Sequence, residues 1–215
     1  MIEGRAELET EIRNAVLTAI YKKNGVRYVP VAISNRHAHL SRADIDVLFG
    51  AGYSLTPIKP LSQPGQYAAK ETVSLIGSKG RIDCIRILGP ERKSSQVEIS
   101  VTDSFRLGVE PIPRMSGETS GSAGARIETK LGYVDLSEGV IVAARHMHIS
   151  SRQALEMGLS DGQTVSLKSG GRRGVVFDNV IVRSGDCFDL EAHIDTDEAN
   201  AALLRNGDIL EVVLA

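Results

Sequence analysis

Apolar residues recur with a helical period near the start of the chain. Between residues 6 and 24 they return every three or four positions, which predicts an amphipathic helix that ends at Gly25. The residues on this apolar stripe are Leu8, Ile12, Ala15, Val16, Ala19 and Ile20. Such a helix either packs on its own domain or docks a partner, and the pattern fits both. Residues 1–5, "MIEGR", are typical of a protease-site remnant, so we leave them out of the fold prediction.

From Val29 the apolar period changes to two, which predicts a strand. Alternate side chains of a strand lie on one face, so a histidine pair with one residue between its members projects from a single side. The residues that share this face are Val29, Val31, Ile33, Asn35, His37 and His39. A short helix with a serine cap and a glycine stop is expected next, over residues 41–50.

The same order of features returns 109 residues later in the chain. The residues at every second position that would share one face of this second strand are Val140, Val142, Ala144, His146 and His148. The segment "SSRQALEMG" that follows again predicts a short helix. We therefore predict an internal duplication of a unit made of a strand, a histidine pair and a helix. Two related halves are then expected to meet at one site.

Most of the remaining chain is typical of short strands separated by glycine. Examples are "TVSLIG", "RIDCIRILG", "QVEISVT", "TVSLKSG" and "DILEVVLA". A spacing of roughly 8 to 12 residues between such strands indicates a barrel or a sandwich. A hydrophobic fraction of 42% with only 4% aromatic residues also suits a β-rich globular protein. The sequence therefore predicts a mainly β fold.

Composition narrows the classes of partner. A net charge of −2 argues against a general nucleic-acid binder, which usually carries a basic excess. No apolar run approaches the roughly 20 residues of a membrane span, and no signal peptide is visible. The two cysteines, Cys84 and Cys187, lack CxxC spacing, and we expect both to be small buried residues. We predict a soluble cytoplasmic protein that binds neither nucleic acid nor membrane.

The histidine pairs are the strongest chemical signal. Imidazole is the commonest metal ligand, and a pair at i and i+2 on a strand can bind one ion from a single face. Five histidines placed at random would give about a tenth of one such pair, whereas the chain has two. If one ion is bound by one pair and the other ion by the second pair together with His193, all five histidines of the chain are metal ligands. Three nitrogen or oxygen ligands with an open position favour zinc.

A carboxylate is the expected third ligand for the remaining histidine pair. Glu98 alternates with Val97 and Ile99 in a predicted strand and is a candidate, although a solvated strand face would give the same pattern. Arg92 lies six residues earlier and either reaches an anion near that metal or is a surface charge. The Gly/Ser-rich loop 114–126 is a flexible connection or a backbone nest for phosphate, without the Gly-Lys-Ser/Thr ending of a P-loop.

Four motifs together resemble one family. "SNRHAHLS", "RILGPERKSSQVEIS", "ARHMHIS" and "HIDTDEANA" are similar to PduL-type phosphate propanoyltransferases, the phosphotransacylases of propanediol-utilising and related bacterial microcompartments. The resemblance runs from about Arg27 to the C-terminus. It implies two zinc ions per chain, the first bound by His37, His39 and Glu98 and the second by His146, His148 and His193. It also implies that Arg92 holds phosphate.

The resemblance further implies a fold and partners. It implies two small β-barrels with short capping helices, an N-terminal helix at 1–25, a first barrel from 26–35 and 144–215, and a second from 36–143. Coenzyme A contacts are implied at Ser34, Asn35, Lys59, Lys79, Arg86 and Asn200. The N-terminal helix then resembles an encapsulation peptide that binds shell or cargo proteins inside a microcompartment for propanediol degradation. We expect a homodimer, the commonest arrangement of soluble oligomers.

The implied reaction is acyl-CoA + phosphate ⇌ acyl phosphate + CoA, on propanoyl-CoA. A bound metal deprotonates a coordinating thiol and polarises a carbonyl, and arginine offers a planar fork to phosphate. We expect direct attack of phosphate on the thioester, with one zinc taking the CoA sulfur and the other zinc orienting phosphate together with Arg92. A covalent acyl-enzyme is disfavoured because no histidine remains to pair with a serine or cysteine nucleophile.

Three other readings fit parts of the sequence. A cupin-like oxygenase or isomerase also uses two histidines in a small barrel, but it needs a glutamate shortly after them, where this chain has only Asp44. A metallo-hydrolase usually continues as HxHxDH, and neither copy does. "MGLSDGQTVSLKSGGRRG" and "NGDILEVV" also suit a metal-free barrel that binds a nucleotide-like ligand. The zinc content of the purified protein would distinguish this last hypothesis, which needs no metal, from the enzyme hypotheses.

Overall fold

The computed structural model describes residues 2–214 of the chain, with side chains from residue 8 onward. Its internal contacts divide the chain into two compact units. The terminal unit comprises Met1–Ser34, Arg145–Ile194 and Glu198–Ala215, and the central unit comprises Asn35–Ala144 and Asp195–Asp197. Each unit contains its own hydrophobic core.

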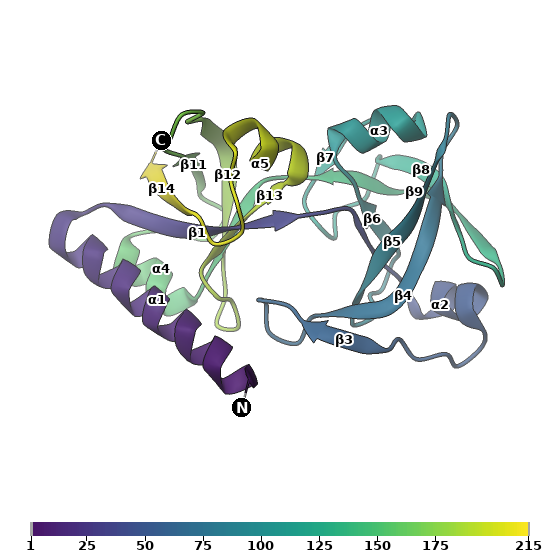
Figure 1. The fold of residues 1–215 in the computed structure, drawn as a ribbon, viewed down its shortest axis with the longest axis horizontal. Coiled ribbons are helices and arrows are strands. Elements are labelled where there is room, and N and C mark those ends of the chain that lie inside the picture. The colour runs from purple at the N-terminus through teal and green to yellow at the C-terminus, as the bar shows by residue number, and fades with distance from the viewer. Residues whose placement is uncertain (1, 215) are drawn as a thin grey trace. The chain divides into compact units, whose positions relative to one another are not determined.

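The terminal unit is a closed barrel of six strands (Figure 1). In order around the barrel they are β1 (Arg27–Ser34), β13 (Glu191–Asp195), β10 (His146–Ile149), β12 (Val176–Ser184), β11 (Thr164–Lys168) and β14 (Ile209–Leu214). Alternate residues of these strands fill the interior, among them Val29, Val31, Met147 and Ile149. The helices α1 (Ile2–Asn24), α4 (Ser151–Met157) and α5 (Thr196–Ala202) each add side chains to this core.

The central unit also closes through six strands. In order they are β4 (Tyr67–Ile76), β5 (Arg81–Gly89), β2 (His37–His39), β6 (Gln96–Glu98), β9 (Tyr133–Ala143) and β8 (Ala123–Glu128), which pairs back with β4. The short strands β3 (Pro57–Pro60) and β7 (Pro113–Arg114) extend the sheet, and α2 (Arg42–Phe49) and α3 (Val101–Leu107) complete the unit. The predicted mainly β fold with two barrels and short helices is therefore confirmed.

Serine caps begin the short helices α2, α3 and α4, as the sequence predicts for two of them. The hydroxyl of Ser41 accepts a hydrogen bond from the backbone N–H of Asp44, and Ser150 accepts one from Gln153. A third cap, Ser100, begins α3 directly after β6. Because a side-chain acceptor satisfies an otherwise unpaired N–H of the first turn, each cap fixes where its strand ends and its helix begins.

Each predicted histidine strand is interrupted two residues before its histidines. β1 ends at Ser34 and β2 begins at His37; β9 ends at Ala143 and β10 begins at His146. The cause is a change of partners, because β1 pairs in the terminal barrel whereas β2 pairs with β5 and β6 in the central one. The prediction of one continuous strand through each run is wrong. Each half of the chain contributes its leading strand to the barrel that the other half completes.

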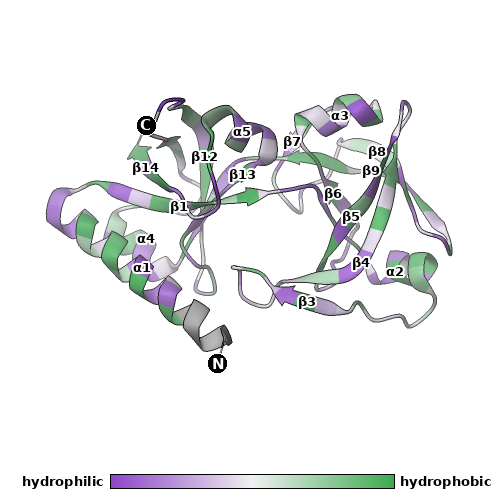
Figure 2. Ribbon diagram, viewed as in Figure 1, coloured by the Kyte–Doolittle hydropathy of each residue, from purple (hydrophilic) through white to green (hydrophobic). Residues whose placement is uncertain are grey.

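Helix α1 starts at Ile2, before the predicted residue 6, and packs through a different face from the one predicted. Leu17 and Thr18 are buried, and Gln153 donates a hydrogen bond to the Thr18 hydroxyl at 3.3 Å. Of the predicted stripe only Ile20 packs on the core; Leu8, Ile12, Ala15, Val16 and Ala19 are exposed. Apolar positions therefore recur along the solvent side of α1 as well, and Figure 2 shows hydrophobic residues, in green, along this helix.

Both cysteines are exposed, so the prediction that they are buried is wrong. Cys84 lies where the register of β4 and β5 shifts, between the pairs Val73↔Ile85 and Leu75↔Ile82. Its backbone φ is +59°, and this bulge takes it out of the inward and outward alternation of the strand. Cys187 lies in the loop between β12 and β13.

Within residues 2–214, no helix combines the length and the apolarity that crossing a membrane requires.

Candidate metal centres

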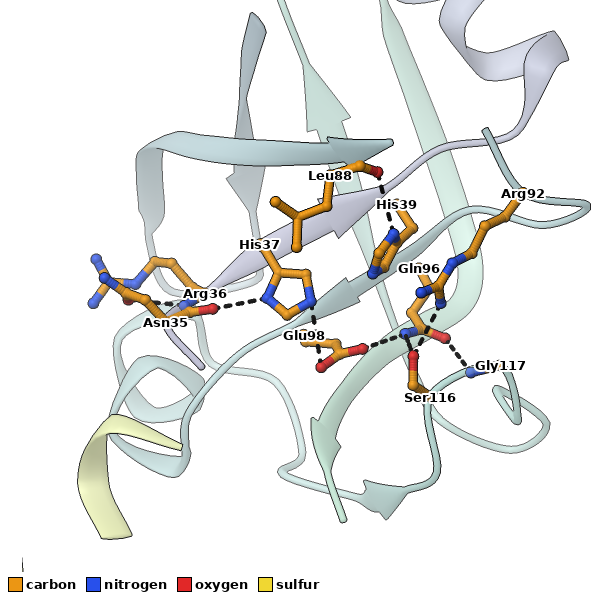
Figure 3. A network of polar contacts seen from close by, with 10 residues as sticks. All are labelled: Asn35, Arg36, His37, His39, Leu88, Arg92, Gln96, Glu98, Ser116 and Gly117. Carbon is orange, nitrogen blue, oxygen red and sulfur yellow. Dashed lines mark hydrogen bonds and ion pairs between the residues drawn. The ribbon is translucent and has the colours of Figure 1, made fainter. Parts of the chain in front are cut away.

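The first predicted ligand set comes together in the central unit. β2 presents His37 and His39, and the antiparallel strand β6 places Glu98 opposite His37. One ligand atom from each of the three lies within 4.8 Å of the others, and His37 Nε2 is 3.4 Å from Glu98 Oε2. All three side chains are buried. Figure 3 shows them with the residues that contact them. Strand alternation and register together therefore gather three metal-type donors at one point.

Backbone carbonyls hold both imidazoles in one tautomer. His37 Nδ1 lies 2.8 Å from the carbonyl oxygen of Asn35, and His39 Nδ1 lies 3.2 Å from that of Leu88 (Figure 3). A carbonyl only accepts, so each Nδ1 is the protonated nitrogen and each Nε2 is available as a ligand atom. Metal-bound histidines in general use this type of outer hydrogen bond to fix ring orientation. The geometry fits a metal ion.

Charges in this cluster also suit a cation. Burial together with the charges of His37 and Arg92 lowers the pKa of His39 to about 3. Burial by itself would raise the pKa of Glu98, but His37 and further hydrogen bonds hold it well below its usual range. Against the effect of burial, Glu98 raises the pKa of His37. Near neutral pH the cluster therefore has a neutral His39 and an anionic Glu98, and these are the protonation states that bind a metal ion.

A polar network links Glu98 to Arg92. Gln96 Nε2 donates to Glu98 Oε1 at 2.7 Å and to the Ser116 hydroxyl at 3.0 Å. Arg92 Nη1 donates to the same hydroxyl at 2.9 Å, and the backbone N–H of Gly117 donates to Gln96 Oε1 at 2.7 Å (Figure 3). The predicted phosphate residue is thus tied to the predicted metal ligand.

Two members of this network, Gln96 and Ser116, were not among the predicted site residues. Gln96 could have been found, because it lies two residues before Glu98 and so shares its face of β6. Ser116 is one of several serines in the 114–126 loop, and nothing in the sequence distinguishes it. This loop therefore does more than connect two strands: it supplies Ser116 and the N–H of Gly117 to the site.

The second predicted ligand set lies in the terminal unit. His146 and His148 come from β10, and β13 places His193 opposite His146. The three ring centroids lie 4.9 Å from one another, and one ligand atom from each lies within 4.8 Å of the others. Each of the five histidines of the chain therefore belongs to one of the two clusters.

This second cluster has a different surrounding. Burial, with the charges of His146 and Arg183, lowers the pKa of His148 to about 3, so its ring is neutral at pH 7. The ring of Phe188 stacks on His148 at 4.4 Å, and His148 Nδ1 is buried without a hydrogen-bond partner among the described residues. A buried polar atom left unsatisfied in this way is costly, and coordination of a metal would satisfy a nitrogen of this kind.

The residues predicted to contact coenzyme A are divided between the units. Ser34 ends β1 and Asn200 lies on α5, both in the terminal unit. In the central unit, Asn35 holds His37 through its carbonyl, and Arg86 on β5 lies opposite His37 in the register. Two lysines lie further from β2: Lys59 is on the exposed strand β3, and Lys79 is in the turn between β4 and β5, beside the end of α3.

Comparisons with known proteins match most of the chain. The family model for phosphate propanoyltransferase covers residues 30–205. The phosphate propanoyltransferase of Thermotoga maritima is 52% identical over 185 residues, which are 85% of this chain and 88% of that protein. The relative from Rhodobacter capsulatus is 50% identical over 184 residues, 86% of each chain, and that from Clostridioides difficile is 42% identical over 206 residues, 96% of this chain and 97% of that one.

These matches and the two barrels define an acyltransferase with a mainly β fold. Identity of 42% to 52% over more than four fifths of the chain leaves no doubt about common descent. The chain belongs to the phosphate propanoyltransferase family, and the resemblance read from the four sequence motifs is confirmed.

Proposed function

We propose that this chain catalyses acyl-CoA + phosphate ⇌ acyl phosphate + CoA, with propanoyl-CoA as the acyl donor. Membership of the phosphate propanoyltransferase family supports the reaction. The observation that carries the proposal is the network through Ser116, which joins Arg92 to Glu98. An arginine fixed beside a set of metal-type ligands is suited to binding phosphate.

We propose further that each histidine cluster binds one zinc ion. Imidazole nitrogens and a carboxylate oxygen are zinc ligands, and three such ligands leave a coordination position open. When bound, zinc supplies Lewis acidity and stabilises a thiolate. The protein's own contribution is to keep His39 neutral, Glu98 anionic and both imidazoles of β2 in the metal-binding tautomer.

Arg92 is the residue proposed to bind phosphate. The Ser116 hydroxyl occupies one N–H of its guanidinium and thereby orients the group. A phosphate oxygen then forms a bond to the thioester carbonyl carbon, the carbon–sulfur bond breaks, and CoA leaves as the thiolate. Direct attack is supported because all five histidines belong to the two clusters, which leaves none to activate a serine or cysteine nucleophile. We propose Ser34, Asn35, Lys59, Lys79, Arg86 and Asn200 as the coenzyme A contacts.

The test is release of free thiol from propanoyl-CoA by zinc-loaded protein in the presence of phosphate. Thiol release should require phosphate, and arsenate should replace it, because acyl arsenate hydrolyses and draws the reaction forward. Acetyl-CoA and butanoyl-CoA in parallel reactions show whether propanoyl is the preferred group. Zinc-loaded protein that releases no thiol from any of the three would contradict the proposal and favour a cupin-like oxygenase.

We also propose that α1 binds a shell or cargo protein of a bacterial microcompartment. The support is an exposed apolar row on its solvent side, formed by Leu8, Ile12 and Val16. Replacing these three residues with serine should abolish co-sedimentation with shell proteins and leave thiol release unchanged. Leu17→Ser is the matched control for helix packing, because Leu17 faces the barrel core. Co-sedimentation that survives the triple change would refute a docking role. For the oligomeric state a homodimer stays our expectation.

A further inference from the structure

The internal duplication extends well beyond the histidines. The histidine strands β2 and β10 are 109 residues apart, as are the starts of α2 and α4, whereas later segments are related by 95 residues: β5 (Arg81–Gly89) with β12 (Val176–Ser184), and α3 (Val101–Leu107) with α5 (Thr196–Ala202). Even the backbone agrees, because Cys84 and Asn179, also 95 residues apart, both have a φ of +59°. An interaction in one half of the chain can therefore be compared with the interaction at the equivalent position in the other half.

One such interaction is an arginine–carboxylate pair. Arg36 stands directly before the first histidine pair, and its Nε donates to Asp103 Oδ2 at 2.8 Å. Arg145 stands directly before the second pair, and its Nε donates to Glu198 Oε1. The two arginines are 109 residues apart and the two acids are 95 residues apart, so the ion pair occupies the same place in each half.

The acids stand at a fixed distance from the third ligands. Asp103 follows Glu98 by five residues, and Glu198 follows His193 by five. Each acid is the third residue of the short helix after the third-ligand strand, α3 or α5. Each ion pair therefore connects the start of a histidine strand to the helix that follows the strand of the third ligand.

The acid of each ion pair is largely shielded from water. The side chain of Asp103 is only 6% exposed and that of Glu198 only 20%, while the arginines are 37% and 33% exposed. An ion pair with one desolvated partner is stronger than a surface pair, which contributes little. The central position also needs reinforcement, because β2 and β6 have only three residues each and the chain changes partners immediately before the histidines. Few ladder hydrogen bonds remain to prevent sliding of His37 against Glu98.

We propose that Arg36–Asp103 and Arg145–Glu198 are positioning pairs, each of which fixes a histidine pair against the third ligand of its own metal centre. The inference rests on the proposed metal binding and adds residues that do not touch the ion. Ligands must be held within about 0.5 Å of a productive geometry. Outer residues that orient metal ligands typically contribute ten- to a hundredfold to metal affinity.

The experiment measures zinc affinity by competition with a chromogenic chelator. In a His148→Ala background only the central centre remains, so its affinity is read without interference. There, Arg36→Ala and Asp103→Asn should each weaken zinc binding about ten- to a hundredfold. The double variant should bind zinc no more weakly than the single variant that has the larger loss, because both changes break the same ion pair. In a His39→Ala background, Glu198→Gln should weaken the terminal centre by a similar factor. The absorption spectrum of bound Co²⁺ should shift in each case.

A conservative variant separates positioning from simple stabilisation. Asp103→Glu should keep most of the affinity, because the other half of the chain uses glutamate at the equivalent position. The matched control is Arg126→Ala, which breaks an exposed bidentate pair with Asp135 in the same barrel and should not alter zinc affinity. Asp103→Asn preserves side-chain volume and stays informative if Arg36→Ala fails to fold.

The outcomes are distinct. Unchanged zinc affinity and an unchanged Co²⁺ spectrum, with or without a lower melting temperature, would overturn the positioning role while leaving the metal proposal in place. An unmodified chain that binds no zinc would instead overturn the proposed metal centres themselves, and with them this inference.

Discussion

The two histidine clusters stand on equivalent strands but distribute charge differently. In the central unit the third-ligand strand is Gln96-Val97-Glu98, and in the terminal unit it is Glu191-Ala192-His193. The carboxylate is the proposed ligand in the first and lies two residues before the proposed ligand in the second, where Glu191 Oε2 is 3.5 Å from His193 Nε2. The neutral and charged side chains have therefore exchanged positions: Gln96 precedes Glu98 in β6, whereas Glu191 precedes His193 in β13.

This exchange gives each centre a different net charge. Three neutral imidazoles would leave a divalent ion its full charge, whereas Glu98 would cancel one unit. The centre with the weaker remaining charge is also the one to which Arg92 is tied through Ser116. A phosphate anion at that centre would therefore be bound by an arginine as well as by the metal, and we propose on this basis that the two centres have divided the labour of the reaction since the duplication.

Removing one ligand from either cluster is expected to have the largest effect. His39→Ala and His148→Ala should each lose about one of two zinc ions and most of the turnover, because a third protein ligand is needed to retain the ion. Elemental analysis and thiol release measure the two outcomes, with the exposed Arg126→Ala as the control. Unchanged zinc in both variants would contradict both metal centres at once.

Acid should destabilise the metal-free protein, and more so through the terminal cluster. The pKa values of His39 and His148 lie near 3 in the folded chain, below the ordinary 6.5. Because the unfolded chain takes up these protons first, the stabilisation present above pH 6.5 is lost as the pH falls towards 3. We expect the free energy of unfolding to fall by roughly 2 to 4 kcal/mol for each such histidine.

The raised pKa of His37 acts in the opposite direction, because protonation of His37 stabilises the folded state as the pH falls through this raised pKa towards 6.5. The central cluster should therefore show the smaller net effect. Urea unfolding with chelator present, between pH 8 and pH 4, measures how the free energy of unfolding changes with pH. His148→Gln and His39→Gln should each reduce this pH dependence by a similar amount, and a pH dependence that neither variant changes would mean that the two histidines have been assigned the wrong electrostatics.

Arg92→Ala should affect the reaction through phosphate. Loss of a charge-assisted contact costs about 1.5–3 kcal/mol, or roughly ten- to a hundredfold in kcat/KM for phosphate. Arg92→Lys should restore only part of the rate, since it keeps the charge without the planar fork. Arg183→Ala in the terminal unit is the comparison variant. An equal loss of phosphate dependence there would remove the proposed division of labour.

The smallest effect is expected from Ser116→Ala. Its hydroxyl contacts Arg92, Gln96 and Glu98, and one lost hydrogen bond of this kind costs about 1 kcal/mol, or roughly fivefold. The loss should appear in KM for phosphate, with zinc content unchanged. Ser122→Ala, in the same loop but bonded only to backbone atoms, is the control. A loss confined to kcat would show that Ser116 acts on something other than phosphate binding.

The ligand sets could be predicted because they depend on local alternation. Parity alone places His37 and His39 on one face, and it also turns Glu98 away from its apolar neighbours. The break at residues 35–36 could not be predicted, since the alternation continues through it and only pairing with distant strands decides where β1 ends. Local alternation in the sequence predicts that these segments are strands, but it does not predict which strands pair with one another.

Other misses have the same origin. The packed face of α1 is chosen by contacts with α4, such as the hydrogen bond from Gln153 to Thr18, across 135 residues of sequence. Cys84 is exposed because of a register shift that no single strand reveals. The role of Ser116 depends on hydrogen bonds to residues 20 and 24 positions away. In each case the deciding interaction joins segments that are remote in the sequence.

The exchange of leading strands sets an order for folding during synthesis. All six strands of the central barrel have been made by residue 143, so this barrel can close while the rest of the chain is still on the ribosome. β1 is made before any of them, yet β14, with which it pairs, ends at residue 214. Until β14 has been made, the backbone N–H and C=O groups of β1 that pair with it have no partner, and such exposed strand edges favour aggregation. Pro30, which lacks an N–H and lies inside β1, reduces that hazard during the wait.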